Sequence, residues 1–237
     1  MKATTVLIGN FGSGKSELAL NLAMRSVRGG SSTVLVDLDI INPYFRSAER
    51  KHMLEQNGVK LIYPTYAMTG VESPTVPPDV YSVFIDEHET VLFDVGGDPS
   101  GAVALGQFKR NFDELGQLHV LCVVNCMRPF SATLEQNLTM MAQIQTRCRL
   151  AITGIVNNAN LSYETTPQVI AEGYSMVERI SRETGIPVVM TSGMKAPLSG
   201  FVRLARELEL DPSYMGETYE IERYMRRDWE SFTTLGI

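Results

Sequence analysis

Short runs of apolar and β-branched residues alternate with longer segments that carry helix-forming residues at amphipathic spacing. The apolar runs predict buried strands and the longer segments predict helices. The expected strands are 4–8, 33–37, 59–63, 90–94, 118–124, 150–156 and 187–191, and the expected helices are 17–24, 45–56, 131–147 and 166–183. Because the strands are apolar on both faces and alternate with helices, we expect an α/β fold with a mostly parallel sheet covered by helices on both faces.

Residues 9–16 directly follow the first predicted strand and fit the phosphate-binding pattern G-x-x-x-x-G-K-[S/T] at every constrained position. The glycines let the main chain curl with its N–H groups inward, where they and the helix N-terminus hold phosphates. Lys15 is expected to bridge the β- and γ-phosphates, and the Ser16 hydroxyl to bind magnesium. A plain glycine-rich turn is the alternative. The residues predicted to contact the nucleotide here are Gly9, Asn10, Phe11, Gly12, Ser13, Gly14, Lys15, Ser16 and Glu17.

Carboxylates stand at the ends of two other predicted strands. Asp94 closes an apolar strand in the manner of a Walker B aspartate and is predicted to hold magnesium, directly or through water. The same residue begins a D-x-x-G pattern whose glycine, Gly97, is predicted to contact the γ-phosphate through its N–H group. Aspartate and glycine are also ordinary turn residues.

Asp37 and Asp39 follow the second predicted strand, so both are expected beside the nucleotide at the carboxyl edge of the sheet. They are predicted as catalytic residues that orient an attacking water or accept a proton from a substrate hydroxyl. Asp37 is predicted as a magnesium ligand as well. The alternative for Asp39 is a cap on the turn before Asn42 and Pro43.

The phosphate loop, the D-x-D at the second strand and the sequence Phe93-Asp94-Val95-Gly96-Gly97 together resemble the MinD/ParA/CobQ superfamily of P-loop ATPases, within the SIMIBI class. The resemblance covers most of residues 1–195. It implies a three-layer P-loop NTPase fold, ATP and Mg²⁺ as cofactors, and a homodimer. Many members have a second lysine near the start of the loop that reaches the partner subunit's phosphates. Asn10 stands there in this chain, which puts hydrolysis across a dimer in doubt because an amide cannot neutralise transition-state charge.

Residues 157–160 read Asn-Asn-Ala-Asn at the end of a later predicted strand, where GTPases of this class carry N-K-x-D. Asn157 is predicted to contact the nucleotide. Asn160 replaces the guanine-reading aspartate, and a neutral amide lacks the carboxylate that accepts both guanine N–H groups, so ATP is favoured over GTP. An asparagine-rich turn is the alternative.

Composition limits the number of domains, the kinds of partner and the cellular location that we expect. The chain has 237 residues, 44% of them hydrophobic, which suits one domain over 1–237, with a C-terminal helical extension at 207–237 that packs on the domain or on a second subunit. The net charge of −6 argues against nucleic acid or anionic membrane as a standing partner. The three cysteines show no C-x-x-C spacing, and neither a signal peptide nor a membrane span is evident, so we expect a cytoplasmic protein.

These features predict a magnesium-dependent ATPase. ATP is expected to order residues 94–106 and the proline-rich loop 64–78, and thereby to change affinity for a protein partner. A small-molecule kinase or an ATP-dependent ligase of the dethiobiotin synthetase type is one alternative, and a non-catalytic nucleotide-gated module is another. Arg46 and Arg128 follow predicted strands and are candidates to contact a phosphate or carboxylate, or to be solvated.

Overall fold

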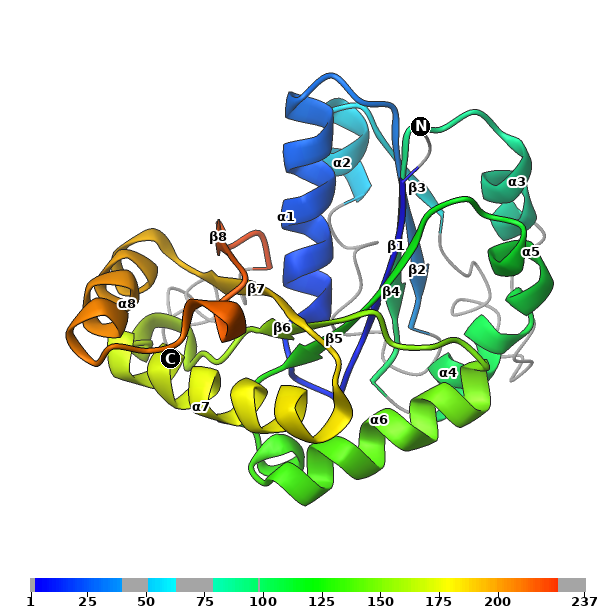
Figure 1. Ribbon diagram of the computed structural model, residues 1–237. Helices are drawn as coiled ribbons and strands as arrows, with labels where there is room; N and C mark the ends of the chain where they lie inside the picture. Colours follow the sequence, from blue (N-terminus) through cyan, green and yellow to red (C-terminus); the bar gives the residue numbers. More distant parts are fainter. Residues whose placement is uncertain (1–2, 40–50, 63–78, 98, 226–237) are drawn as a thin grey trace, which may run out of the picture.

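A computed structural model describes residues 3–39, 51–62, 79–97 and 99–225. Its centre is an eight-stranded sheet in which every neighbouring pair is parallel, in the order β3-β2-β4-β1-β5-β6-β7-β8 (Figure 1). The strands are β1 Ala3–Ile8, β2 Thr33–Leu38, β3 Val59–Ile62, β4 Thr90–Val95, β5 Leu118–Val124, β6 Gly154–Asn157, β7 Val188–Gly193 and β8 Glu217–Glu220. The predicted α/β fold with its parallel sheet is confirmed.

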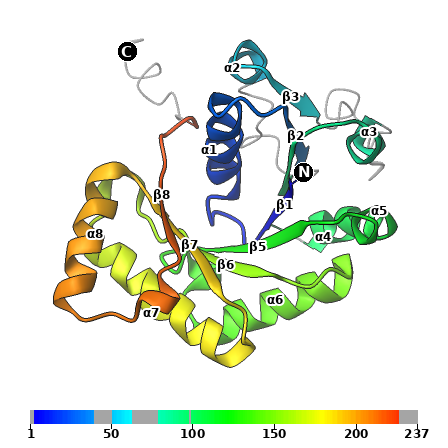
Figure 2. The ribbon, with the colours of Figure 1, turned by 45° about the horizontal axis from the view of Figure 1, so that its top comes forward.

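Helices cover both faces of this sheet. They are α1 Lys15–Arg28, α2 Lys51–Gln56, α3 Asp79–Ile85, α4 Pro99–Gly106, α5 Lys109–Asp113, α6 Leu134–Cys148, α7 Pro167–Thr184 and α8 Lys195–Glu207. Helices α1 and α2 pack on one face and α3 to α7 on the other, while α8 packs against α7 (Figures 1 and 2). The fold therefore has three layers, with the sheet between two layers of helices. The loops at the carboxyl edge of the sheet lead from the strands into both helical layers.

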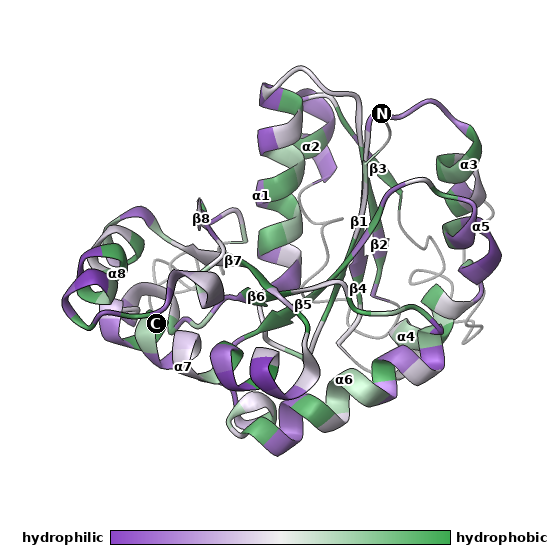
Figure 3. Cartoon of the chain, in the orientation of Figure 1, coloured by the Kyte–Doolittle hydropathy of each residue, from purple (hydrophilic) through white to green (hydrophobic). Residues whose placement is uncertain are grey.

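Successive residues of the central strands face opposite layers. In β1, Val6 and Ile8 belong to the core under α3 to α7, whereas Leu7 belongs to the core under α1. All three are at most 1% exposed. Both faces of the strand are therefore apolar, as the hydropathy colouring also shows for the inner strands (Figure 3). Burial on both sides holds the loops that follow these strands in fixed positions.

The C-terminal region differs from the prediction. Within the part of 207–237 that the structure describes, the chain continues from α8 into the edge strand β8 instead of a long helix. Gly216 makes the turn into β8 with φ of 62°, and a Cβ there would lie 2.3 Å from the main-chain N of Met190. The chain thus comes down directly beside β7, where Tyr219 is buried and its neighbours are exposed.

Several expectations fall outside the described residues: the start of the helix at 45–56, the loop 64–78, Asn42, Pro43, Arg46 and everything after 225. The organisation of 1–237 as one domain stays a prediction. Among the residues that are described, no helix is long and apolar enough to cross a membrane.

Candidate functional site

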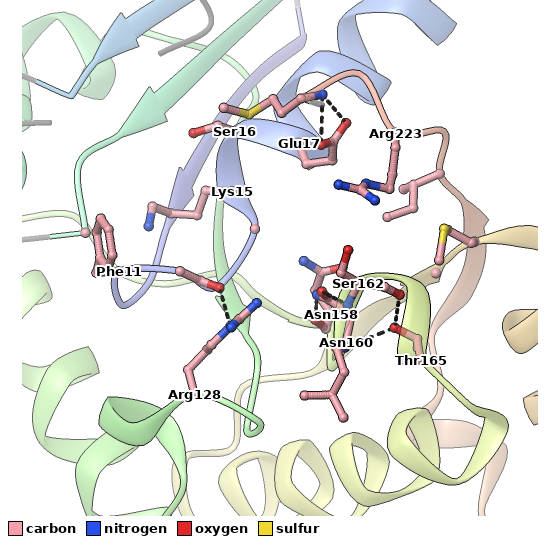
Figure 4. Close-up of a pocket in the computed structure, with 18 of the residues that line it drawn as sticks. Phe11, Lys15, Ser16, Glu17, Arg128, Asn158, Asn160, Ser162, Thr165 and Arg223 are labelled. Carbon is pink, nitrogen blue, oxygen red and sulfur yellow. Dashed lines mark hydrogen bonds between the residues drawn. The ribbon is translucent and has the colours of Figure 1, made fainter. Parts of the chain in front are cut away.

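A cavity of about 690 Å³ lies at the carboxyl edge of the sheet. One end is lined by the loops that follow β1, β2, β4 and β5, and the other by the segments that follow β6, β7 and β8 (Figure 4). We call these the loop end and the far end. The volume of the cavity lies within the range of small-molecule and cofactor sites. The position matches the general rule that open α/β sheets bind ligands outside the carboxyl ends of their strands.

The predicted phosphate loop forms the wall of the loop end. Gly9, Gly12 and Gly14 adopt φ angles of 143°, 76° and 91°, which only glycine adopts without strain. A Cβ at Gly9 would lie 2.4 Å from the carbonyl oxygen of Val123 in β5. Lys15 is 6% exposed, and its ammonium group donates to the carbonyls of Gly9 and Asn10, each at 3.0 Å. The main chain of residues 9–15 therefore forms a ring before any ligand binds, and the Lys15 ammonium group lies across its opening.

The N-terminus of α1 opens into this ring. Gly14 occupies the N-cap position in left-handed conformation, and no side chain caps the helix. Main-chain N–H groups of the first helical turn thus face the cavity together with the positive end of the helix dipole. Such an arrangement binds anions, phosphates above all.

Asp94 lies behind Ser16 at the end of β4 and is 2% exposed. Burial raises the pKa of its carboxyl to about 6; the Ser16 hydroxyl, which donates to it, and the Lys15 charge lower the pKa, and the nearby Asp39 raises it. The Oδ2 atom of Asp94 is buried with no hydrogen-bond partner among the described residues. An orphaned carboxylate oxygen beside a hydroxyl fits a divalent cation.

The predicted carboxylate pair separates into two roles. Asp39 lines the cavity, whereas Asp37 is 1% exposed and does not line it. Oδ1 of Asp37 accepts the main-chain N–H of Asp39 at 2.9 Å. Asp37 therefore positions the main chain of Asp39, and its predicted direct contact with metal or substrate stays a prediction. The described residues hold no group of three His, Cys, Asp or Glu side chains for a self-contained metal site.

Gly97, predicted to contact the γ-phosphate, lines the cavity and packs on the phosphate loop. A Cβ at this position would lie 2.5 Å from the main-chain N of Phe11. The segment after β4 and the phosphate loop are thus in main-chain contact, and no larger residue fits between them.

Asn10, predicted to contact the nucleotide, does not line the cavity, and its side-chain amide is bonded elsewhere. Its Nδ2 donates to the carbonyl of Phe130 at 2.7 Å and to the Ser131 hydroxyl at 2.9 Å. The amide ties the phosphate loop to the segment after β5. From that segment Arg128 reaches the cavity, and its Nε donates to the Gly12 carbonyl at 3.2 Å (Figure 4).

Among the asparagines at the end of β6, Asn160 lines the cavity at the predicted base-reading position, whereas Asn157 does not line it. Asn157 is fully buried, donates to the carbonyl of Ile170 and accepts from the N–H of Ala159, so its side chain does not contact the cavity. Asn158 and Asn160 line it instead. Nδ2 of Asn158 donates to the carbonyl of Ser13 at 2.7 Å, which fastens the phosphate loop to β6.

Three stretches at the far end were not identified from the sequence: 161–165, 193–194 and 221–225. Their link to the loop end is Glu17, whose carboxylate accepts the main-chain N–H groups of Tyr224 and Met225. Glu17 lines the cavity as predicted, but its carboxylate is bonded to the main chain of the segment after β8. No sequence pattern connects positions about two hundred residues apart, so only the fold reveals this contact.

No protein-family model matches the sequence, and no curated protein matches it either. Solved structures with a similar fold include the cell division protein FtsY of Thermotoga maritima, with 23% identity and a TM-score of 0.56 over 83% of this chain and 64% of that one. The signal recognition particle receptor FtsY of Elizabethkingia anophelis, in complex with GDP, has 18% identity and a TM-score of 0.55 over 81% of this chain and 57% of that one.

Chloroplast FtsY of Physcomitrella patens is similar as well, with 17% identity and a TM-score of 0.55 over 81% of this chain and 58% of that one. This chain therefore spans 57% to 64% of the length of these three proteins. At such identities the likeness shows a shared α/β fold and nothing finer. The resemblance to the MinD/ParA/CobQ superfamily stays a prediction.

Proposed function

We propose that this protein is a magnesium-dependent nucleoside triphosphatase that uses ATP and acts as a nucleotide switch on a protein partner. The observation that carries the proposal is the preformed ring at the N-terminus of α1, with Lys15 held across its mouth by two carbonyls. When a triphosphate enters, the ammonium group exchanges these carbonyls for phosphate oxygens, which are stronger charge-assisted partners.

Ser16 and Asp94 fit the magnesium that this fold implies, with Asp39 at the cavity wall beside them. Bound magnesium would neutralise charge on the β- and γ-phosphates. Asp39 is the residue we assign to orient the attacking water, and Asp37 fixes its main chain. Arg128 supplies a cation at Gly12, which partly replaces the lysine that other members have where this chain has Asn10.

Two features support switching on a protein partner. The main chain at Gly97 rests on Phe11, so a γ-phosphate that moves the loop also moves the segment after β4. Phe11 and Phe130 line the loop end with 54% and 69% of their surfaces exposed, and exposed apolar side chains at a site mouth suit a docked protein.

ATP is preferred over GTP because Asn160 offers an amide where guanine is read by a carboxylate, and because that amide is already bonded to the Asn158 carbonyl and the Ser162 N–H group.

The deciding experiment measures phosphate release from Mg·ATP and Mg·GTP by the wild type and by Lys15→Ala and Asp39→Asn. Lys109→Ala is the matched control, because Lys109 pairs with Asp113 on α5, away from the cavity. Steady release from ATP that Lys15→Ala abolishes supports the proposal. Release only with an added small metabolite indicates a kinase or ligase, and binding without turnover indicates a regulatory module.

The switch is tested by hydrogen exchange of peptides from residues 94–106, with α7 as the internal control. We expect slower exchange with a non-hydrolysable ATP analogue than with ADP, and no change in α7. Equal exchange in both nucleotide states contradicts the switch.

A further inference from the structure

Arg223 lines the far end of the cavity, on the segment that follows β8. Its guanidinium projects into the cavity on the side of Asn158 and Ser162, across from Lys15 (Figure 4). A nucleotide whose phosphates occupy the loop end extends its base toward this group. The inference below therefore rests on the proposed function.

The main chain is held on both sides of Arg223. Asn21 in α1 accepts from the N–H of Glu222 at 2.7 Å and donates to its carbonyl at 2.9 Å. Glu17 accepts the N–H groups of Tyr224 and Met225. Both sets of hydrogen bonds come from α1, the helix that begins at the phosphate loop. The main chain at Arg223 is therefore held in a fixed position relative to that loop without a ligand.

One nitrogen of the guanidinium finds no partner in the part of the chain that the structure describes. Its Cζ lies 4.0 Å from the ring centroid of Tyr163, a cation–π contact that sets the plane of the group. Its Nη1 is buried and finds no hydrogen-bond acceptor among the described residues. A buried charged donor without an acceptor is costly to maintain, and a ligand in the cavity supplies the missing acceptor.

The neighbouring polar side chains are already engaged. Asn158 donates to the Ser13 carbonyl and accepts from Ser192. Asn160 donates to the Asn158 carbonyl and accepts from the N–H of Ser162. Recognition by either amide must compete with these bonds, whereas recognition by Nη1 of Arg223 supplies an acceptor that the described residues do not offer.

We propose that Arg223 determines purine specificity by donating from its guanidinium to N7 of the nucleobase. Arginine offers donors only, and N7 is an acceptor on both adenine and guanine that the pyrimidine ring does not have. Tyr163 holds the guanidinium plane, and the clamps from Asn21 and Glu17 fix its distance from the phosphate loop.

The test compares the dissociation constants of Mg·ATP and Mg·7-deaza-ATP, which lacks the N7 acceptor, for the wild type and Arg223→Gln. Guanine nucleotides are titrated as a parallel pair, so that an error in the choice of ATP does not hide the contact. We expect the wild type to bind the natural purine about tenfold more tightly than its 7-deaza analogue, the size of one hydrogen bond to a charged group. Arg223→Gln should lose most of this preference and bind the natural purine more weakly, because the glutamine amide is neutral and reaches less far than the guanidinium.

Two controls separate this contact from other effects. Arg28→Gln removes a surface partner of the same segment, since Arg28 contacts Glu222 and Tyr224 outside the cavity, and it should keep the tenfold preference. Inorganic tripolyphosphate should bind the wild type and Arg223→Gln equally, because it contacts the loop end alone.

Each result has one meaning. A wild type that binds both members of each pair equally, or an Arg223→Gln protein that keeps the preference, overturns the inference and leaves the proposed function intact. A wild type that binds neither nucleotide nor tripolyphosphate overturns the proposed function, and the inference with it. The wild-type comparison decides the matter even if Arg223→Gln does not fold.

Discussion

The two ends of the cavity are built in opposite ways. The loop end depends on one continuous stretch, residues 9–17, with one residue added after β2, one after β4 and three after β5. The far end has no such stretch and is assembled from the three segments that follow β6, β7 and β8. The site therefore follows the order of strands in the sheet, from β2 and β4 across β1 and β5 to β8.

Rigidity also has a different origin at each end. The loop end is held by glycine conformations and main-chain contacts, as at Gly9 against Val123 and Gly97 against Phe11. The far end is held by side-chain clamps from α1 on segment 221–225. We therefore expect substitutions at the loop end to abolish binding or turnover, and those at the far end to change which nucleotide binds and how tightly.

The largest effect is expected from Lys15→Ala. It removes the charge that faces the phosphates and the two hydrogen bonds that span the ring. Loss of one preorganised charge-stabilising group costs on the order of 10²- to 10³-fold in turnover, and we expect a loss of this size in kcat/KM. Phosphate release measures it. Near wild-type kcat/KM in the folded variant contradicts the assignment of the phosphate loop.

Asp94→Asn should stabilise the metal-free protein. Burial raises the pKa of Asp94 from 3.8 to about 6, so the folded state binds a proton more tightly than the unfolded state. Its contribution to folding therefore becomes less favourable as pH rises from about 4 to about 6, by up to about 3 kcal/mol in total. Above pH 6 the variant should exceed the wild type in unfolding free energy by up to that amount, and the difference should shrink toward pH 4.

Urea unfolding in EDTA at several pH values measures this difference. Magnesium with nucleotide should reverse the order, because the wild-type carboxylate then gains a cation and the amide does not. A stability difference that is the same at pH 5 and pH 7.5 contradicts the assigned protonation of Asp94.

Arg128→Ala should slow turnover with little change in KM. The guanidinium bonds the Gly12 carbonyl, and in the proposed function it faces the developing phosphate charge, so its loss is expected to lower kcat about 30-fold. Arg128→Lys should recover part of the rate, since it keeps the charge without the planar donors. Arg110→Ala, on the exposed surface of α5, is the control. An unchanged kcat would mean that a group other than Arg128 stabilises the charge that develops on the phosphate.

The contrast between the two ends explains what the sequence could predict. Seven strands and the phosphate loop were predictable, because hydrophobic runs and glycine conformations are local properties of the chain. Strand β8 was predicted as a helix, because Ile221, Tyr224 and Met225 have helical spacing while their partners lie on α1. Its pairing with β7 depends on the turn at Gly216, which lies against the main chain of Met190. This tertiary contact cannot be predicted from local sequence.

Side-chain direction was the second limit. The positions of Asn10, Asp37 and Asn157 near the site were predictable from the strands that they end or follow, but the direction of each side chain was not. Asn10 bonds the segment after β5, Asp37 supports Asp39, and Asn157 bonds α7. Asn10 and Asn157 donate to carbonyls that are distant in sequence, whereas Asp37 accepts an N–H group two residues further on, and the sequence does not identify these partners.

The smallest effect is expected from Asn21→Ala, which loosens the far end without touching the cavity. Asn21 is 6% exposed and bonds both main-chain groups of Glu222, so its loss frees the segment that carries Arg223. A less ordered arginine must be fixed at the moment of binding, and we expect ATP affinity to fall about threefold while tripolyphosphate affinity stays constant. Asn57→Ala is the matched control, an exposed amide that donates to the Met53 carbonyl in the helix it follows. Calorimetric titration of both ligands measures the difference. Equal weakening of ATP and tripolyphosphate would mean that the clamp supports the phosphate loop itself, and the two ends of the cavity would then not be independent.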